Sequence, residues 1–292
     1  MPTLAQTIDG LIASRNPDAG TRSRLAYWRD ALGERELVEI TIDDVDAALV
    51  ALATRGRLRP SSKGTTPTGK PLKGSTINRY LAELSGVYVA ARRLRLLPRN
   101  HQPPSRGLER HPEPPDANRY LTPEQVERLI AVCPLVDPHW GKLEALVRLL
   151  ATTGLRIGNA LALRWQDVDL ERRTVTVART KNGQPHTATL PQKTAEALAR
   201  LPGGFPGALV FGGPEGRPYS PRRLWRRAAE TAGLPRATPH WLRHSFGYRL
   251  AQAGASQTLI MHSLGHRSLS AAARYTHASV EDRRLLVDRV FG

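Results

Sequence analysis

Apolar residues recur at helical spacing near the start of the chain. Leu4, Ile8 and Leu11 repeat every three or four positions, and a similar spacing returns within residues 25–32. A period of this length is typical of an amphipathic helix with one buried face. The pattern predicts two such helices within residues 3–32.

Two more helices follow, separated by a segment without periodicity. Thr41 precedes an acidic turn and predicts the start of a third helix, since Thr caps helices and acids favour their first turn. Ser75 is predicted to cap a long helix that runs to about Leu96. Residues 55–74 are basic and rich in Gly, Pro, Ser and Thr, so we expect a mobile loop there.

The pattern stops at a proline-rich stretch. Residues 97–119 contain six prolines and almost no apolar side chains. Such composition is typical of a linker between domains. We therefore expect a helical domain over residues 1–96, a linker over 97–119 and a second domain over 120–292.

The second domain begins with a strong helix-start signal. Thr122 is predicted to be the N-cap, with Pro123 at the first helical position and Gln125 completing a capping box. Residues 174–179 and 186–190 alternate between apolar and polar types, with turn residues between them, and predict a β-hairpin. Helical patterns occupy about 139–153, 156–163, 192–201, 221–232, 239–253, 256–263 and 279–290.

The order of these segments sets the fold class. Helices come first, then a small β insertion, then helices again, without the repeated βαβ alternation of a doubly wound sheet. The fold class we expect is mainly α with a small β-hairpin or sheet insertion, in the α+β sense.

Composition adds a partner to this picture. The chain has 43 basic and 26 acidic side chains and a formal net charge of +17, which favours a polyanion such as nucleic acid. Cys133 is the single cysteine, so no internal disulfide can form. The sequence shows neither a basic leader with an apolar run nor a stretch long enough to span a bilayer. We therefore expect a cytoplasmic protein with no membrane partner.

Several residues could carry chemistry on phosphate. His240 and Arg243 are three positions apart on a predicted helix, so they share a face and could address one phosphate. Arg156 follows the helix break at Gly154, and Tyr275 comes nine residues after His266. Taken singly, each of these residues is more often a surface charge or a packing aromatic.

Neither a metal ion nor a cofactor is expected. Asp167 and Asp169 lie close together, but no spaced His or Cys partners accompany them. The chain also has no glycine-rich nucleotide loop of the G-x-x-x-x-G-K-[ST] type.

The order of the motifs is more informative than any one of them. TGLR, a lysine on the hairpin, HxLRH and LGH…YTH follow one another in residues 121–277. In this order and spacing they resemble the tyrosine recombinase (phage integrase) family. Residues 1–96 resemble, in general character only, the helical core-binding (SAM-like) domain of that family, which binds DNA.

The resemblance implies an active site for cutting and rejoining DNA. It assigns two catalytic arginines, a hairpin lysine, two histidines and a nucleophilic tyrosine, which here are Arg156, Arg243, Lys181, His240, His266 and Tyr275. The tyrosine would form a 3′-phosphotyrosine bond and release a 5′ hydroxyl. Because this intermediate conserves the energy of the broken bond, resealing would need no ATP.

The residue types suit this reaction. Two arginines can neutralise and position the phosphate oxygens without a metal. A tyrosine with an ordinary pKa of about 10 needs help at neutral pH, which the arginines and a neutral His240 could give. Lys181 could protonate the leaving 5′ oxygen, and His266 could donate a hydrogen bond to the phosphate.

Two positions near the motifs require comment. Asn159 stands where members of the family usually carry an acid, three residues after the first arginine. An asparagine can still form hydrogen bonds but brings no negative charge, so we expect altered activity rather than none. His244, next to Arg243, is interpreted as a structural residue of its helix.

The resemblance also implies how DNA is held. Two domains joined by a linker could close around double-stranded DNA, with most contacts to phosphates. The long helix of the first domain could enter a major groove and carries four arginines, namely Arg79, Arg92, Arg93 and Arg95. A homo-tetramer on paired sites is expected, with the helix at 279–290 docked on a neighbouring subunit or on its own domain. A directionality factor is a possible further partner.

Two alternatives remain at this stage. A type IB topoisomerase uses similar tyrosine chemistry but relaxes supercoils as a monomer. A DNA-binding protein that had kept the fold and lost activity would fit Asn159 but not the complete set of catalytic residue types. The expected function is site-specific DNA recombination, with integration or excision of a mobile element as its setting. Dimer resolution and cassette inversion would use the same active site.

Overall fold

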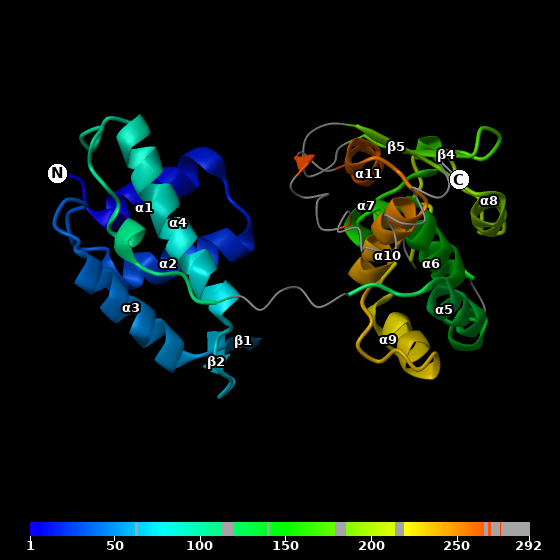
Figure 1. Cartoon of the computed structure of the whole chain (residues 1–292), viewed down its shortest axis with the longest axis horizontal. Coiled ribbons are helices and arrows are strands. Elements are labelled where there is room, and N and C mark those ends of the chain that lie inside the picture. Colours follow the sequence, from blue (N-terminus) through cyan, green and yellow to red (C-terminus); the bar gives the residue numbers. More distant parts are fainter. Residues whose placement is uncertain are drawn as a thin grey trace, which may run out of the picture. The chain divides into compact units, whose positions relative to one another are not determined.

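The structure is a computed structural model that describes residues 1–61, 64–112, 119–138, 141–178, 185–213, 219–265, 268–269 and 275. The chain divides into two compact units, Met1–Pro115 and Asp116–Gly292. Both units consist mainly of helices, and each carries a small antiparallel sheet, so the expected fold class is confirmed (Figure 1). None of the described helices is long and apolar enough to cross a membrane.

The first unit is built on a bundle of helices with one core. Its α-helices are α1 (Leu4–Arg15), α2 (Ala19–Leu32), α3 (Ile42–Arg55) and α4 (Gly74–Arg93). Trp28 and Tyr88 are fully buried between them. The Trp28 indole donates to the Tyr80 carbonyl at 2.8 Å and the Tyr88 hydroxyl donates to the Leu37 carbonyl at 3.0 Å, so the polar atoms of both rings are satisfied.

The segment predicted as a mobile loop contains a β-hairpin instead. Strand β1 (Leu58–Ser61) pairs antiparallel with β2 (Gly64–Pro67), and Leu58 lies opposite Pro67. The Arg57 carbonyl extends the pairing by accepting from the Thr68 amide at 2.8 Å. Residues 65–67 are exposed, so this part of β2 is held by backbone hydrogen bonds to β1 rather than by a buried face. A strand of this kind has no alternating apolar pattern, and the sequence prediction failed for that reason.

The long helix α4 begins and ends at other residues than predicted. Lys73 is its N-cap, without a side-chain hydrogen bond, and Ser75 lies inside the first turn. The helix ends at Arg93, and Arg95 then adopts a left-handed φ of 59°. The predicted cap at Ser75 and end near Leu96 were therefore wrong by two and three residues.

Much of the proline-rich segment packs along the first unit. A 3₁₀ helix, η1 (Pro104–Gly107), places the buried Ser105 hydroxyl 2.7 Å from that of Ser85 on α4. Asn78 bonds both backbone groups of His111, at 3.0 and 2.9 Å. Residues 97–112 are thus anchored to α4 by hydrogen bonds and packing.

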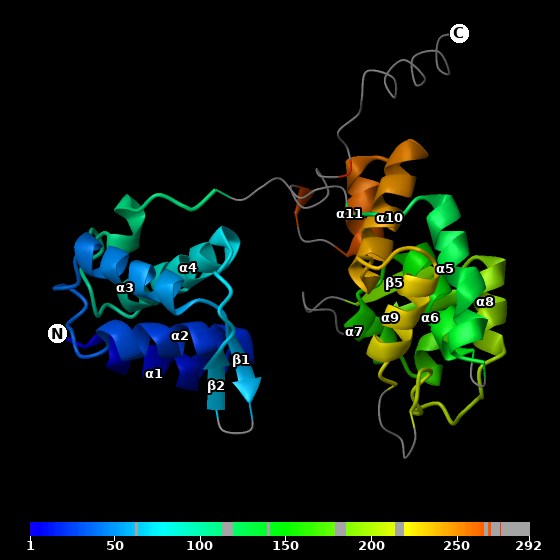
Figure 2. The same ribbon diagram turned by 90° about the horizontal axis from the view of Figure 1, so that it is seen from below.

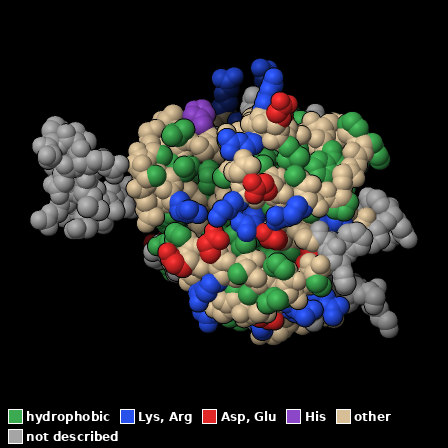
Figure 3. All heavy atoms as spheres, turned by 90° about the vertical axis from the view of Figure 1, so that its right-hand side faces the viewer, with side chains coloured by type: hydrophobic (Ala, Val, Ile, Leu, Met, Phe, Trp, Pro, Cys, Tyr) green, Lys and Arg blue, Asp and Glu red, His purple; other side chains and the backbone are tan. Residues whose placement is uncertain are grey.

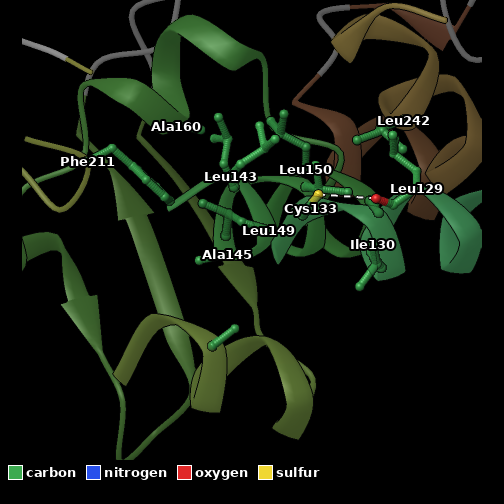
Figure 4. Close-up of a cluster of buried hydrophobic side chains, with 14 of the residues drawn as sticks. Leu129, Ile130, Cys133, Leu143, Ala145, Leu149, Leu150, Ala160, Phe211 and Leu242 are labelled. Atoms are coloured by element: carbon green, nitrogen blue, oxygen red, sulfur yellow. Dashed lines mark hydrogen bonds between the residues drawn. The ribbon is translucent and has the colours of Figure 1, made fainter. Parts of the chain in front are cut away.

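The second unit forms around one buried helix, α6 (Lys142–Thr153), which contacts α5 (Pro123–Val136), α7 (Ile157–Leu161), α8 (Gln192–Ala199) and α10 (Pro239–Gln252). Its sequence is apolar on nearly every face, as a helix packed on several sides requires. Figure 4 shows Leu143, Leu149 and Leu150 of α6 among neighbours from α5 and α10. The buried Cys133 lies in this cluster, and its thiol donates to the Leu129 carbonyl.

The start of α5 confirms the predicted cap. The Thr122 hydroxyl accepts from the Gln125 amide, and the Gln125 side chain accepts from the Thr122 amide. Pro123 occupies the first helical position, as predicted.

A small sheet follows α7, with the antiparallel order β3 (Val168–Asp169), β4 (Thr174–Val177) and β5 (His186–Thr189). The predicted strands 174–179 and 186–190 correspond to β4 and β5, with Val175 opposite Ala188. The two-residue strand β3 was not predicted, because it is too short to show a period. It follows the 3₁₀ turn η2 (Trp165–Asp167).

The four helices predicted between the sheet and residue 264 are present, three with shorter bounds and the last shifted by one residue. The segment after the sheet contains α8, then α9 (Arg222–Thr231), α10 and α11 (Gln257–Leu264). Figures 1 and 2 both show α11 beside α10, and the two helices are in contact. The helix predicted over 279–290 lies outside the described residues.

Candidate active site

The candidate site lies where the end of α6, the middle of α10 and the end of α11 come together. Arg243 of α10 is its centre and is only 3% exposed. Its Nη1 donates to the Gly154 carbonyl at 2.6 Å, and its Nη2 donates to the Leu264 carbonyl at 2.7 Å. These carbonyls belong to helix C-termini, which lack acceptor partners within the helix and favour a cation. Two helix ends therefore fix one guanidinium.

Burial changes the acidity of Arg243 without removing its charge. Loss of water and, to a smaller extent, the nearby charge of Arg156 together lower the pKa of Arg243 to about 10, while Tyr275 acts in the opposite direction. The group is still cationic at neutral pH. Since a phenolate at Tyr275 would favour the arginine cation, the cation in turn favours the phenolate.

Gly154 makes this junction of helices possible. Its φ of 62° is left-handed, and a Cβ there would lie 2.6 Å from the Phe246 ring and 2.7 Å from the Leu264 side chain. A side chain would thus be strained by the backbone and would also push α10 and α11 away. The glycine in the TGLR motif is required by packing as well as by helix termination.

Arg156 supplies a second positive charge to the site. It is the N-cap of α7 and is partly exposed, and it lies close enough to Arg243 to lower that group's pKa. Burial, Arg156 and Tyr275 are the causes of the Arg243 shift, and no carboxylate is among them. Asn159, on α7, is half-buried and adds no charge. Two cations, with no carboxylate among the described groups that shift the pKa of Arg243, provide a site for an anion such as phosphate.

Tyr275 is brought into the same site. Its side chain is 4% exposed, and its hydroxyl lies 2.9 Å from Nδ1 of His244. The ring meets Tyr248 edge-on, with centroids 5.3 Å apart. A Cβ on Gly247 would lie 2.9 Å from the Tyr275 ring, so that glycine leaves the space that the ring fills.

The two histidines of α10 are arranged differently from the prediction. His240 is exposed, and its ring packs edge-on against His244, with centroids 4.6 Å apart. The contact to the Tyr275 hydroxyl comes from His244, which was interpreted as structural. The sequence could have indicated a place for His244 in the site, because it lies four positions after His240 and therefore on the same helix face.

His186 is a further residue that the sequence analysis missed. It lies on the inward face of β5, and a side chain on Gly265 would begin 3.6 Å from its ring. Burial lowers the pKa of His186 below its usual 6.5, and the charges of Arg243 and Arg156 add to this effect, while a hydrogen bond to the Ser263 backbone opposes it. A neutral imidazole therefore lies beside the two arginines at neutral pH. Strand alternation from Ala188 could have indicated that His186 faces inward.

Two of the other predicted site residues lie outside the described residues, and four belong to the first unit. Lys181, within 179–184, and His266 lie outside the described residues. In the first unit, Arg79, Arg93 and Arg95 are exposed, whereas Arg92 donates to the His101 carbonyl at 3.4 Å.

Among the described residues, no group of three or more His, Cys, Asp or Glu side chains could hold a metal ion. The two carboxylates considered in the sequence analysis are used locally. Asp167 accepts from the Arg164 amide at 2.9 Å and Asp169 accepts from the Arg172 amide at 2.8 Å.

Comparison with known proteins agrees with this geometry. The model of the phage integrase family matches residues 119–282. Tyrosine recombinase XerC of Roseiflexus castenholzii is 30% identical over 287 residues, which cover 92% of this chain and 85% of the relative.

Two solved structures show a similar fold. The Tn1549 transposon integrase in complex with transposon right end DNA matches with a TM-score of 0.74 and 20% identity, over 99% of this chain and 100% of that one. A λ integrase tetramer bound to a Holliday junction matches with a TM-score of 0.66 and 19% identity, over 93% and 76% of the two chains.

A helical unit with two clustered arginines and a buried tyrosine agrees with the class of enzymes that exchange DNA strands through a tyrosine. The chain belongs to the phage integrase family of tyrosine recombinases. It is accordingly an enzyme of site-specific DNA recombination.

Proposed function

We propose that Tyr275 is the nucleophile of this recombinase and attacks the scissile phosphate of its DNA site. A bond forms between the Tyr275 oxygen and phosphorus, and the bond from phosphorus to the 5′ oxygen breaks. The observation that carries the proposal is the burial of the Tyr275 hydroxyl in the site of Arg243 and Arg156. The two cations stabilise the charge that grows on the phosphate oxygens.

The remaining roles follow from the motifs. We assign protonation of the leaving 5′ oxygen to Lys181 and a hydrogen bond to phosphate to His266. His240, exposed on α10, is assigned a contact to the DNA phosphate. Asn159 replaces an acid, so the site keeps a larger positive charge, which should strengthen phosphate binding.

We further propose that both units bind double-stranded DNA and that four subunits act on paired sites. The DNA in both similar integrase structures and the tetrameric assembly of the λ integrase support this proposal. Within the first unit, Arg79 and Arg93 are exposed on α4 and are separated by four helical turns, where they could reach phosphates. Arg92 and Arg95 would add to this surface, and residues 279–290 would dock on a neighbouring subunit.

The biological setting that we propose is integration or excision of a mobile element, because the Tn1549 integrase acts on transposon DNA. The protein would work in the cytoplasm at the nucleoid, where its substrate lies. A directionality factor would select between the two directions of the reaction.

The first experiment traps the covalent intermediate. The protein is incubated with nicked duplexes drawn from the DNA that flanks its gene, so that a short strand diffuses away after cleavage. Wild type should give a protein–DNA adduct on denaturing gels, and Tyr275→Phe should give none, because it lacks the attacking oxygen. Sequencing of the trapped strands gives the target site.

The matched control is Tyr120→Phe, which removes a hydroxyl from another ring of the same unit, in tilted contact with Tyr248. It should form the adduct at the wild-type rate. An adduct that persists in Tyr275→Phe would refute the proposed nucleophile. Relaxation of a supercoiled plasmid that lacks the target site would indicate a topoisomerase instead.

A further inference from the structure

The hydroxyl of Tyr275 has a specific partner inside the protein. Nδ1 of His244 lies 2.9 Å from it, which is hydrogen-bond distance. Tyr275 is only 4% exposed, so its proton has little access to bulk water. A buried phenol that becomes a nucleophile must pass its proton to a group within reach.

The same face of α10 also holds the ring in place. His244, Gly247 and Tyr248 are spaced i, i+3 and i+4, and all three meet Tyr275. Arg243 precedes His244 in this helix and is fixed by two backbone carbonyls. The helix that fixes the phosphate-binding cation therefore also fixes the imidazole, with no flexible segment between them.

Other candidates for the proton acceptor are placed less well. His240, which the sequence analysis favoured, is exposed and lies one turn away along α10. Arg243 is a cation at neutral pH and can only donate. His186 lies against Gly265, at the end of α11.

We propose that His244 is a further catalytic residue, which accepts the phenolic proton of Tyr275 during strand cleavage. This inference rests on the proposed role of Tyr275 as the nucleophile. In the tautomer that carries its own proton on Nε2, His244 presents a free lone pair on Nδ1 to the hydroxyl.

The step balances without an added reagent. The proton moves from the Tyr275 oxygen to Nδ1, the oxygen–phosphorus bond forms, and the bond from phosphorus to the 5′ oxygen breaks. That oxygen takes a separate proton, from Lys181 in the proposed mechanism. During rejoining the 5′ hydroxyl attacks phosphorus, and the imidazolium returns its proton to the departing tyrosine.

The test compares two substitutions that separate hydrogen bonding from proton transfer. His244→Asn places an amide where Nδ1 lies and can still bond the hydroxyl, but it cannot take a proton at neutral pH. His244→Ala removes both abilities. With the nicked site recovered from wild-type adducts, both variants should form the adduct about 100-fold more slowly or worse. Binding of the same DNA in gel shifts should not change.

His262→Asn is the matched control, because His262 is an exposed histidine on the neighbouring helix α11. It should form the adduct at the wild-type rate. Thermal unfolding of each variant shows whether a slow rate reflects a damaged fold. A rate in His244→Asn equal to that of wild type would reduce His244 to a positioning role and overturn the proposal, as would a normal rate in His244→Ala.

A second substrate identifies which proton transfer is lost. A nicked site with sulfur in place of the bridging 5′ oxygen has a leaving group that needs no acid. Lys181→Ala should recover most of its lost rate on this substrate, whereas His244→Asn should not, because its defect concerns the nucleophile. Recovery of His244→Asn would overturn the assignment.

The outcomes also separate this inference from the proposed function. An adduct in Tyr275→Phe, or none in wild type, removes the proposed nucleophile and the role of His244 together. An adduct that needs Tyr275 but forms normally in both His244 variants removes the role of His244 alone.

Discussion

Gly247 affects the chemistry of the site through the side chain that it lacks. The Tyr275 ring occupies the space where a Cβ would lie, only 2.9 Å from its nearest atoms. The motif HxLRH indicated a role for its neighbours His240 and Arg243, whereas Gly247 belongs to no motif. Its importance depends on the return of the chain, 28 residues later, to the same helix face.

We predict that Gly247→Ala displaces Tyr275 and slows adduct formation at least about 10-fold, since a displacement of about 1 Å in an active site has effects of this order or larger. Overpacking should also lower the free energy of unfolding by about 1–3 kcal/mol. Adduct gels and urea unfolding measure the two effects. Gly10→Ala is the control, because nothing lies within 4 Å of a Cβ there. A normal adduct rate in Gly247→Ala would show that the tyrosine does not react from the observed position.

Single residues of the site could be predicted only where they belong to a motif. Arg156, Arg243 and Tyr275 were expected together, and the structure brings them together. His244 and His186 were not expected to face the site, because their neighbours come from distant parts of the chain. Sequence spacing gives the face of a helix or strand, but not which element covers it.

At the scale of elements, α10 lies against both α6 and α11, so it connects the buried core to the site. The helices were predictable because their apolar stripes and caps are local signals, as at Thr41 and Thr122. The hairpin of β1 and β2 was missed because its sequence lacks an alternating apolar pattern. The start of α4 was shifted because no capping side chain marks it at Lys73.

The position of β5 beside α11 predicts a pH effect on stability. The folded pKa of His186 is lowered, so the unfolded chain binds a proton more readily as the pH falls through 6.5. The free energy of unfolding should therefore fall below that pH, and it should fall less in His186→Gln. Urea unfolding at about pH 7 and about pH 5 gives the difference.

His262→Gln serves as the control, since His262 is exposed. It should lose stability between the two pH values as the wild type does. An equal loss in His186→Gln and in wild type would exclude His186 as a source of acid sensitivity.

At the scale of the whole molecule, some of the basic side chains form ion pairs with acidic neighbours and are not available to bind a polyanion. Glu144 bonds Arg148 at 2.7 Å and Arg200 at 3.4 Å. Figure 3 shows basic and acidic side chains side by side on the face that it presents. The exposed arginines of α4, Arg79 and Arg93, carry part of the net charge of +17.

We predict that DNA affinity falls steeply with salt, because bound phosphates release counterions. Removing one phosphate contact lowers the slope of log affinity against log salt by about 1, and Arg93→Ala should do so. Fluorescence anisotropy of a labelled duplex over a salt series measures this slope. Arg200→Ala, which removes an arginine paired with Glu144, should leave it unchanged. Equal slopes in wild type and Arg93→Ala would remove Arg93 from the DNA surface.

The carbonyls that hold Arg243 belong to the main chain, and every amino acid provides such an atom. Point substitutions at Leu264 can alter the side chain there, yet the acceptor persists. Insertions and deletions differ, because one residue more or less within α11 turns its last carbonyl by about 100° around the helix axis. The hydrogen bonds that hold Arg243 should therefore tolerate substitutions in α11 but not insertions or deletions. Among related sequences, the segment from Gln257 to Leu264 should keep its length even where its residues differ.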